Sequence, residues 1–159
     1  MGREEQIINE RKKKLDDILK KGINPYPHKY EPKDYSSEIK ENFRKLKNNE
    51  KSKSKAKIAG RVMTVRDLGK LIFATVQDSH GKIQIILQKD ETSKDSFELF
   101  KKYIDIGDIV GCEGIIMKTK TGEISVFCKK IVLLSKSILP LPEKWHGLSD
   151  KEERYRKRY

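Results

Sequence analysis

The sequence predicts a mainly β protein with some helix, in which a five-stranded barrel follows a basic helical extension. Three observations support this prediction. Five runs between residues 58 and 134 tend to alternate apolar and polar side chains, three of the connections between runs are short and contain glycine, and one segment with helical spacing separates the third run from the fourth. Three strands, one helix and two further strands is the order of an OB-fold barrel.

The boundaries of these elements follow from the turn residues. The turns at 67–69, 79–81 and 120–122 suit antiparallel hairpins, because each supplies a glycine. The segment 93–103 spaces its aromatic residues as in a helix. An immunoglobulin-like sandwich would need about seven strands and would not include this helix. The strands are predicted at 58–66, 70–78, 82–89, 108–117 and 123–134.

Three parts of the chain differ in composition. Residues 1–55 form a basic helical N-terminal extension that carries +6 of the formal net charge of +12. Helical spacing of apolar residues predicts a helix at about 4–21, and a second short helix follows near 39–46. The run 48–55 has no apolar side chain, so we expect it to be mobile. Residues 56–135 form the barrel, and residues 136–159 form a proline-containing basic linker.

Composition also restricts the function. The chain of 159 residues has 36 Lys and Arg against 24 Asp and Glu, which favours a phosphate backbone or an anionic membrane as partner. The five apolar residues of the first helix are too few and too mixed with acidic residues to favour a membrane. Neither a membrane span nor a signal peptide is visible, so we expect a cytoplasmic protein.

No catalytic constellation is visible in the sequence. The histidines His28, His80 and His146 are scattered, and no phosphate-binding loop or metal-ligand spacing occurs. Cys112 and Cys128 are expected to be reduced core residues, because nothing suggests a disulfide framework. We therefore expect no catalytic residue, metal or cofactor in this segment.

The alternation in the second and third strands points to a binding face. If the aliphatic residues of both strands face the barrel interior, Phe73 and Gln84 both face outward. The hairpin is expected to set them about three residues apart, roughly 10 Å. OB-folds use this surface to bind nucleic acids, and an exposed ring can stack on a base. The alternative is that Phe73 is an ordinary surface aromatic.

Other polar residues are expected near the same face. Arg66 ends the first strand, and Lys118, Lys120 and Glu123 flank the last hairpin. Arg61 has the opposite parity to Arg66, so both can face one ligand only if the strand bulges, for which we expect Gly60. A site with donors facing the two carbonyls of uracil and an acceptor facing its N3 would bind cytosine more weakly, with a loss of binding free energy of about 1 to 3 kcal/mol.

Four segments resemble the N-terminal part of class II lysyl-tRNA synthetases. These are RKKKLDDILKKGINPYPHKY, IAGRVMTVRDLGKLIFATVQDSHGKIQIILQK, IGDIVGCEGIIMKTKTGEISV and LLSKSILPLPEKWHGLSDKEERYRKRY, and together they cover nearly the whole chain. The resemblance implies that the barrel binds the anticodon of tRNA(Lys), with the central uridine stacked on Phe73. It also implies polar contacts from Arg66, Gln84 and Glu123. Auxiliary tRNA binding would come from the basic helix, through Arg11, Lys12, Lys13 and Lys14.

The same resemblance implies a longer enzyme. In that family ATP, magnesium and lysine are used in a following domain, which would begin where this chain ends, at Tyr159. We therefore expect this segment to lack ligase activity and the full-length enzyme to be a homodimer. Two other functions remain open from the residues alone. One is a general single-strand nucleic-acid-binding OB protein, and the other is a scaffold domain without base selectivity.

Overall fold

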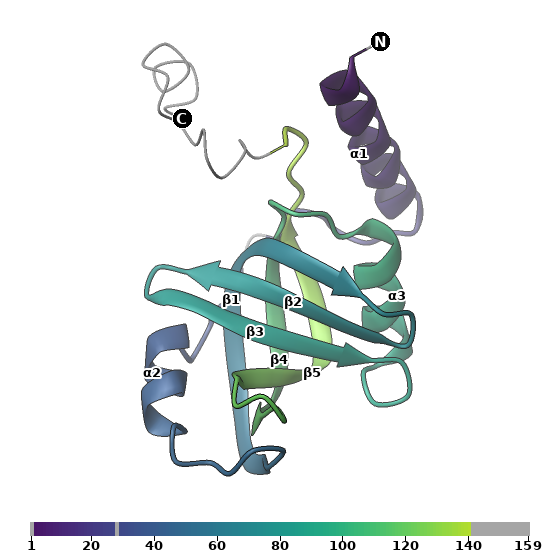
Figure 1. Cartoon of the computed structure of the whole chain (residues 1–159). Coiled ribbons are helices and arrows are strands. Elements are labelled where there is room, and N and C mark those ends of the chain that lie inside the picture. The colour runs from purple at the N-terminus through teal and green to yellow at the C-terminus, as the bar shows by residue number, and fades with distance from the viewer. Residues whose placement is uncertain (1, 28, 141–159) are drawn as a thin grey trace.

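A computed structural model describes residues 2–27 and 29–140 (Figure 1). His28, His146 and the predicted linker from residue 141 onward lie outside the described residues. No helix in the described ranges is long and apolar enough to cross a membrane. The elements are α1 (Arg3–Lys20), α2 (Ser36–Asn42), β1 (Lys51–Asp67), β2 (Leu71–Asp78), β3 (Gly81–Gln88), α3 (Lys94–Tyr103), β4 (Ile109–Lys118) and β5 (Ile124–Ser135).

The five strands form a closed barrel in the order β1-β2-β3-β5-β4. All neighbouring strands are antiparallel except β3 and β5, which are parallel. The parallel pair follows from α3, which carries the chain from the end of β3 to β4 (Figure 1). The predicted fold class and the order of its elements are confirmed.

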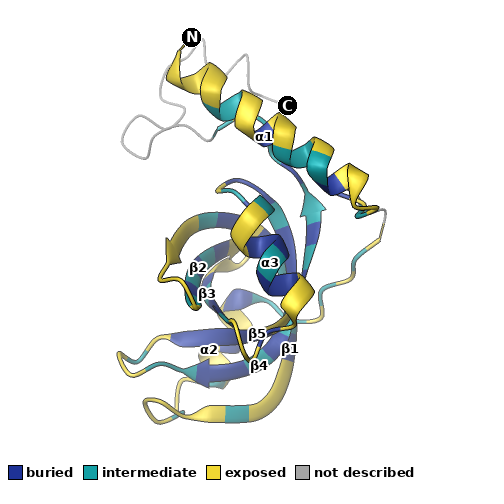
Figure 2. Cartoon of the chain, turned by 90° about the vertical axis from the view of Figure 1, so that its right-hand side faces the viewer, coloured by how far each residue is buried: buried dark blue, intermediate teal, exposed yellow. Residues whose placement is uncertain are grey.

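The interior is filled by the aliphatic sets that the alternation predicts. The inward-facing residues of β2 and β3 are all buried, and they are Ile72, Ala74, Val76, Ile83, Ile85 and Leu87. The barrel core also includes Ile18 from α1 and Ile39 from α2, both fully or almost fully buried. Figure 2 shows α1 as a mixture of exposed and half-buried residues with only two short buried positions. Each helix of the extension thus contributes one fully or almost fully buried apolar side chain to the core.

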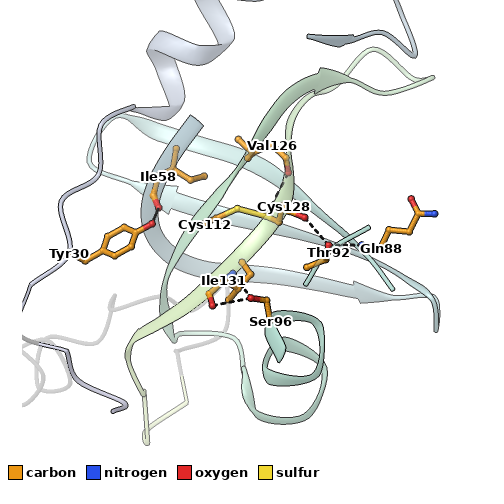
Figure 3. Close-up of a disulfide and its surroundings, with 9 residues drawn as sticks. All are labelled: Tyr30, Ile58, Gln88, Thr92, Ser96, Cys112, Val126, Cys128 and Ile131. Carbon is orange, nitrogen blue, oxygen red and sulfur yellow. Dashed lines mark hydrogen bonds between the residues drawn. A yellow bond between two sulfur atoms is a disulfide. The ribbon is translucent and has the colours of Figure 1, made fainter. Parts of the chain in front are cut away.

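The helix α3 closes one end of the barrel against β5. Ser93 caps its first turn by accepting a hydrogen bond from the backbone N–H of Ser96. Ser96 in turn binds the backbone of Ile131, accepting from its N–H at 2.9 Å. Thr92, just before the helix, donates to the carbonyl of Cys128 at 2.7 Å (Figure 3). These polar contacts fix α3 while Phe97 and Phe100 pack into the core.

The strand β1 begins earlier than predicted. The expectation that 48–55 is mobile is wrong from Lys51 onward, because Lys51 pairs with Met117 and Lys55 with Ile115 on β4. Strand pairing uses backbone groups, so a run of Lys and Ser can form a ladder without burying its side chains. The exposed start of β1 in Figure 2 illustrates this. The boundary expected between residues 55 and 56 therefore lies inside β1.

The two cysteines are paired, so the expectation that both are reduced is wrong. Cys112 on β4 and Cys128 on β5 form a disulfide, with their Cα atoms 6.1 Å apart (Figure 3). Both residues are buried, as expected. The residue directly opposite Cys128 is Gly114, which has no side chain, and Cys112 lies two positions further along β4. The strand register that brings them together could not be read from their sequence separation of 16.

Asp78 at the end of β2 ties the extension to the hairpin. Its carboxylate accepts hydrogen bonds from the backbone N–H and the hydroxyl of Ser36, at 2.8 and 2.7 Å, and from the backbone N–H of His80 at 2.8 Å. Burial disfavours the ionised form, but these hydrogen bonds outweigh it and hold the pKa of Asp78 below its ordinary value of 3.8. The first turn of α2 therefore depends on an ionised Asp78.

We expect the substitution Asp78→Asn to lower the free energy of unfolding at neutral pH, and this deficit to shrink as the pH falls below about 3.8. The reason is that a carboxylate with a lowered folded-state pKa stabilises the fold above its ordinary pKa and loses that effect as pH falls through the folded-state value. Urea unfolding at a series of pH values measures the difference. Asp90→Asn, at an exposed position, is the control. A deficit that stays constant down to strong acid would contradict the prediction.

Candidate nucleic-acid interface

A groove of about 750 Å³ lies on the outer face of the barrel. We call it the aromatic groove. Its apolar surface comes from Leu71, Phe73, Ile86, Met117 and Phe127, and its polar side chains include Arg66, Thr75, Gln84, Gln88 and Lys120. These residues come from all five strands or the turns between them. The groove therefore exists only when the barrel is closed.

Phe73 is the half-buried aromatic residue of this groove. It lies opposite Arg66 on β1 and opposite Ile86 on β3. Its ring packs against a small apolar cluster on the outer face, formed by Ile86, Met117 and Phe127, which is separate from the barrel core. The residues that support the Phe73 ring are thus not part of the barrel core, and the ring remains partly accessible to solvent. A ring held in this way can stack on a flat ligand without first being ordered.

Gln84 lies closer to Phe73 than the sequence suggested. It pairs with Thr75 in the β2–β3 ladder, two residues from Phe73 rather than the expected three. Two residues correspond to about 7 Å along a strand and keep both side chains on one face. The amide of Gln84 makes no hydrogen bond within the described part of the chain and is partly exposed. It is therefore available to a ligand that covers Phe73.

Arg66 and Arg61 share a face because β1 bulges. The irregularity lies between Val62 and Thr64, at Met63, and not at Gly60 as expected. Arg66 pairs with Phe73 and lines the aromatic groove. Arg61 pairs with Gln77, four residues further along β2, and does not line the groove. The bulge thus occurs, but it leaves Arg61 at a distance from Phe73.

The last hairpin borders the same groove. Thr119, Lys120 and Thr121 line it, and the turn is closed by a hydrogen bond from the backbone N–H of Glu123 to the hydroxyl of Thr119 at 3.0 Å. Glu123 itself is exposed beside the groove and does not line it. Lys118 points elsewhere, since its ammonium donates to the carbonyl of Arg44 at 3.0 Å. Of the basic residues expected at this hairpin, only Lys120 lines the groove.

Phe127 and Lys51 are two of the groove residues that were missed from the sequence. Phe127 is buried at the base of the groove, with the ammonium groups of Lys51 and Lys129 at 4.6 and 5.1 Å from its ring centre. Phe127 faces outward between Val126 and Cys128, which both face the barrel core. An apolar residue at a position where the alternation calls for a polar one is the signal that could have indicated it. Lys51 was assigned to a mobile run and therefore could not be placed. Strand β1 carries it to the groove.

The four basic residues of α1 that were expected to bind RNA divide into two pairs. Arg11 is buried, and its guanidinium donates to the carbonyls of Ile106, Ser137 and Leu139 at 3.0, 3.3 and 3.2 Å. This position corrects the expectation that Arg11 contacts RNA, because its hydrogen bonds all go to carbonyl groups of the protein. Lys14 forms an ion pair with Asp105 at 2.7 Å. Lys12 and Lys13, on the other side of the helix, are exposed.

Beneath Arg11 lies a buried charged cluster that joins the extension to the end of β5. The ammonium of Lys136 lies 2.7 Å from Asp105 and 2.6 Å from Asp108. Burial opposes ionisation of Asp105, but hydrogen bonds from Lys136 and Lys14 hold its pKa below the ordinary value. Burial raises the pKa of Asp108, whose carboxylate also accepts from the backbone N–H of Ser137 at 2.8 Å. The cluster fixes where the chain leaves the barrel.

Comparison with known proteins assigns the barrel. A family model described as an OB-fold nucleic acid binding domain matches residues 56–134. This part of the chain belongs to that family. It is the part that carries the aromatic groove, apart from Asn49 and Lys51 at the groove's edge. Among residues 2–27 and 29–140, no group of three or more His, Cys, Asp or Glu could hold a metal ion.

The curated relatives extend the similarity to nearly the whole chain. A lysine–tRNA ligase of Fervidobacterium nodosum is 44% identical over 147 residues, which is 92% of this chain and 28% of the relative. Lysine–tRNA ligases of Dehalococcoides mccartyi and Methanoculleus marisnigri are both 46% identical, over 98% and 92% of this chain and 31% and 28% of their own lengths. The resemblance to lysyl-tRNA synthetases is therefore confirmed. The chain spans about three tenths of the length of these relatives.

The structural role of Arg11 can be separated from a role in binding. We expect Arg11→Met to lower the free energy of unfolding by about 1 to 3 kcal/mol, because it removes the donor of three part-buried hydrogen bonds. Lys12→Met, one residue along and exposed, is the matched control and should change stability by less than about 0.5 kcal/mol. Urea denaturation measures both. Equal stability of the two variants would refute the structural role of Arg11.

Proposed function

We propose that the chain is the anticodon-recognition module of a lysine–tRNA ligase and binds the anticodon stem-loop of tRNA(Lys). The observation that carries this proposal is the position of Phe73, on the outer face between Arg66 and Ile86 and supported by its own apolar cluster. The family that matches the barrel is named for the tRNA anticodon, and the relatives are named as lysine–tRNA ligases. The net charge of +12 suits an RNA partner.

The proposed binding step begins with stacking. An anticodon base turned out of its loop covers the accessible side of Phe73, while the outer apolar cluster prevents the ring from moving away. Stacking of this kind contributes about 1 to 3 kcal/mol per base and does not depend on base identity. Affinity therefore comes partly from Phe73, and selectivity has to come from the polar residues around it.

Hydrogen bonding supplies the proposed selectivity for uridine. The amide of Gln84 can accept a hydrogen bond from uracil N3–H and donate one to a neighbouring carbonyl, whereas the guanidinium of Arg66 can only donate. Both side chains line the aromatic groove within two ladder positions of Phe73. Cytosine has an acceptor at N3, which leaves at least one of these groups mismatched. Glu123, exposed beside the groove, is a further proposed contact.

The basic helix is proposed to add affinity that is independent of base sequence. Of the four basic residues expected to bind RNA, Lys12 and Lys13 are available, since Arg11 and Lys14 are bound to the protein. Contacts from exposed lysines to phosphates are salt-sensitive and carry no sequence information. Lys118 and Arg61 remain proposed RNA contacts at the periphery, beyond the groove lining.

The remaining activity is proposed for a longer protein. The ligase reaction with ATP and magnesium, the dimeric state and the cytoplasmic location all belong to the full-length enzyme that the relatives represent. The described residues contribute no metal-ligand cluster to that chemistry. The role of this module is to hold the correct tRNA while the reaction takes place elsewhere.

The stacking step is tested by titrating an anticodon stem-loop against variants of Phe73. We expect Phe73→Ala to weaken binding by about 1 to 3 kcal/mol, or roughly 5-fold to 150-fold. Phe73→Leu keeps most of the packing against Ile86 and Met117 but removes the ring, so it should bind nearly as weakly while unfolding like the unmodified chain. Full affinity in Phe73→Leu would show that the ring does not stack on the RNA.

Selectivity is tested with a stem-loop in which the central uridine is replaced by cytidine. We expect the unmodified chain to bind this RNA about 1 to 3 kcal/mol more weakly, and Gln84→Met to lose most of that preference, because methionine fills the same space without an amide. Fluorescence anisotropy measures all four affinities. Equal binding of both RNAs by the unmodified chain would instead identify a general single-strand-binding protein.

A further inference from the structure

A second groove, of about 490 Å³, lies on the outer face of β1, β4 and β5. We call it the lysine groove. Its lining contains no aromatic ring, and its only carboxylates are those of Asp34 and Glu113. Five lysines line it, namely Lys33, Lys55, Lys57, Lys129 and Lys130. The lysine groove is therefore strongly cationic, and none of its described lining residues offers a ring on which a base could stack.

Most of these lysines lack a counter-ion. The carboxylate of Glu113 pairs with Lys57 at 3.7 Å, and that of Asp34 accepts the backbone N–H of Lys57 at 2.9 Å. Lys129 pairs with Glu91 at 3.2 Å. The ammonium groups of Lys33, Lys55 and Lys130 are exposed and form no ion pair in the part of the chain that the structure describes. Three positive charges thus remain uncompensated in one groove.

The lysine groove continues the aromatic groove. Along the β1–β4 ladder, the pair Lys51–Met117 belongs to the aromatic groove, and the next recorded pair, Lys55–Ile115, belongs to the lysine groove. Ile115 also packs against the outer apolar cluster that supports Phe73. Lys129 spans the junction, since it lines the lysine groove with its ammonium 5.1 Å from the ring centre of Phe127. The two grooves therefore adjoin along β1, β4 and β5, so a single strand of RNA can reach both.

We propose that the lysine groove binds the ribose–phosphate backbone of the same RNA whose bases occupy the aromatic groove, at nucleotides that flank the stacked bases. This inference rests on the proposed function. Unpaired lysines without aromatic residues suit phosphates and do not distinguish bases. The groove then sets the direction in which the RNA leaves Phe73 and adds affinity that depends on salt.

The test is the salt dependence of stem-loop binding by the double variant Lys55→Gln, Lys130→Gln. Each lost phosphate contact reduces the slope of log affinity against log salt by about 0.7 to 0.9, so we expect a reduction of about 1.4 to 1.8. Discrimination against the central cytidine should stay unchanged. The matched control is Lys94→Gln, Lys102→Gln on α3, where both lysines are exposed, and its slope should equal that of the unmodified chain.

A second measurement does not depend on affinity. Acylation of lysines followed by mass spectrometry should show Lys55 and Lys130 protected by the stem-loop RNA, and Lys94 and Lys102 unprotected. An unchanged slope, or a slope change equal to that of the α3 control, would overturn the proposal, as would full acylation of Lys55 and Lys130 in the complex.

Failure of the proposed function gives a different result. In that case the unmodified chain binds uridine and cytidine stem-loops equally. The slope change and the protection would still support a backbone site in the lysine groove.

Discussion

Closure of the barrel is the constraint on which the binding surface depends. Because β2 and β3 direct Ile72, Ala74, Ile83 and Ile85 into the core, the residues between them must face outward. A shift of one residue in this ladder would bury the polar set and remove Phe73 from the surface. The aliphatic core that stabilises the fold therefore also orients the aromatic groove, and the two cannot be altered independently.

A second, smaller apolar cluster makes the outer face rigid. Ile86, Met117 and Phe127 are buried although they lie outside the barrel core, and Phe73 packs against them. An aromatic ring on a purely polar surface would sample several rotamers and lose entropy on binding. The apolar cluster beneath Phe73 restricts the ring before binding and so reduces that loss of entropy. Ile115, which lines the lysine groove, packs against the same cluster, so the same apolar residues support both grooves.

The positive charge of the extension has two separate uses. Arg11 and Lys14 hold α1 against two segments, the loop before β4 with Asp105 and Ile106 and the chain after β5 with Ser137. These contacts make both charges part of the fold. The exposed lysines of the same helix contribute nothing to that packing. A count of basic residues along α1 does not distinguish these cases, because the difference depends on what each side chain meets in the folded chain.

The sequence by itself determined the order of strands and helix along the chain, the inward and outward parity of Phe73 and Gln84, and the family resemblance, because these depend on local alternation, turn residues and motif identity. Tertiary structure decided the rest. The bulge at Met63, the pairing of Cys112 with Cys128 and the burial of Arg11 all depend on register between distant segments. Register is set by the packing of the whole barrel, and a local sequence pattern does not specify it.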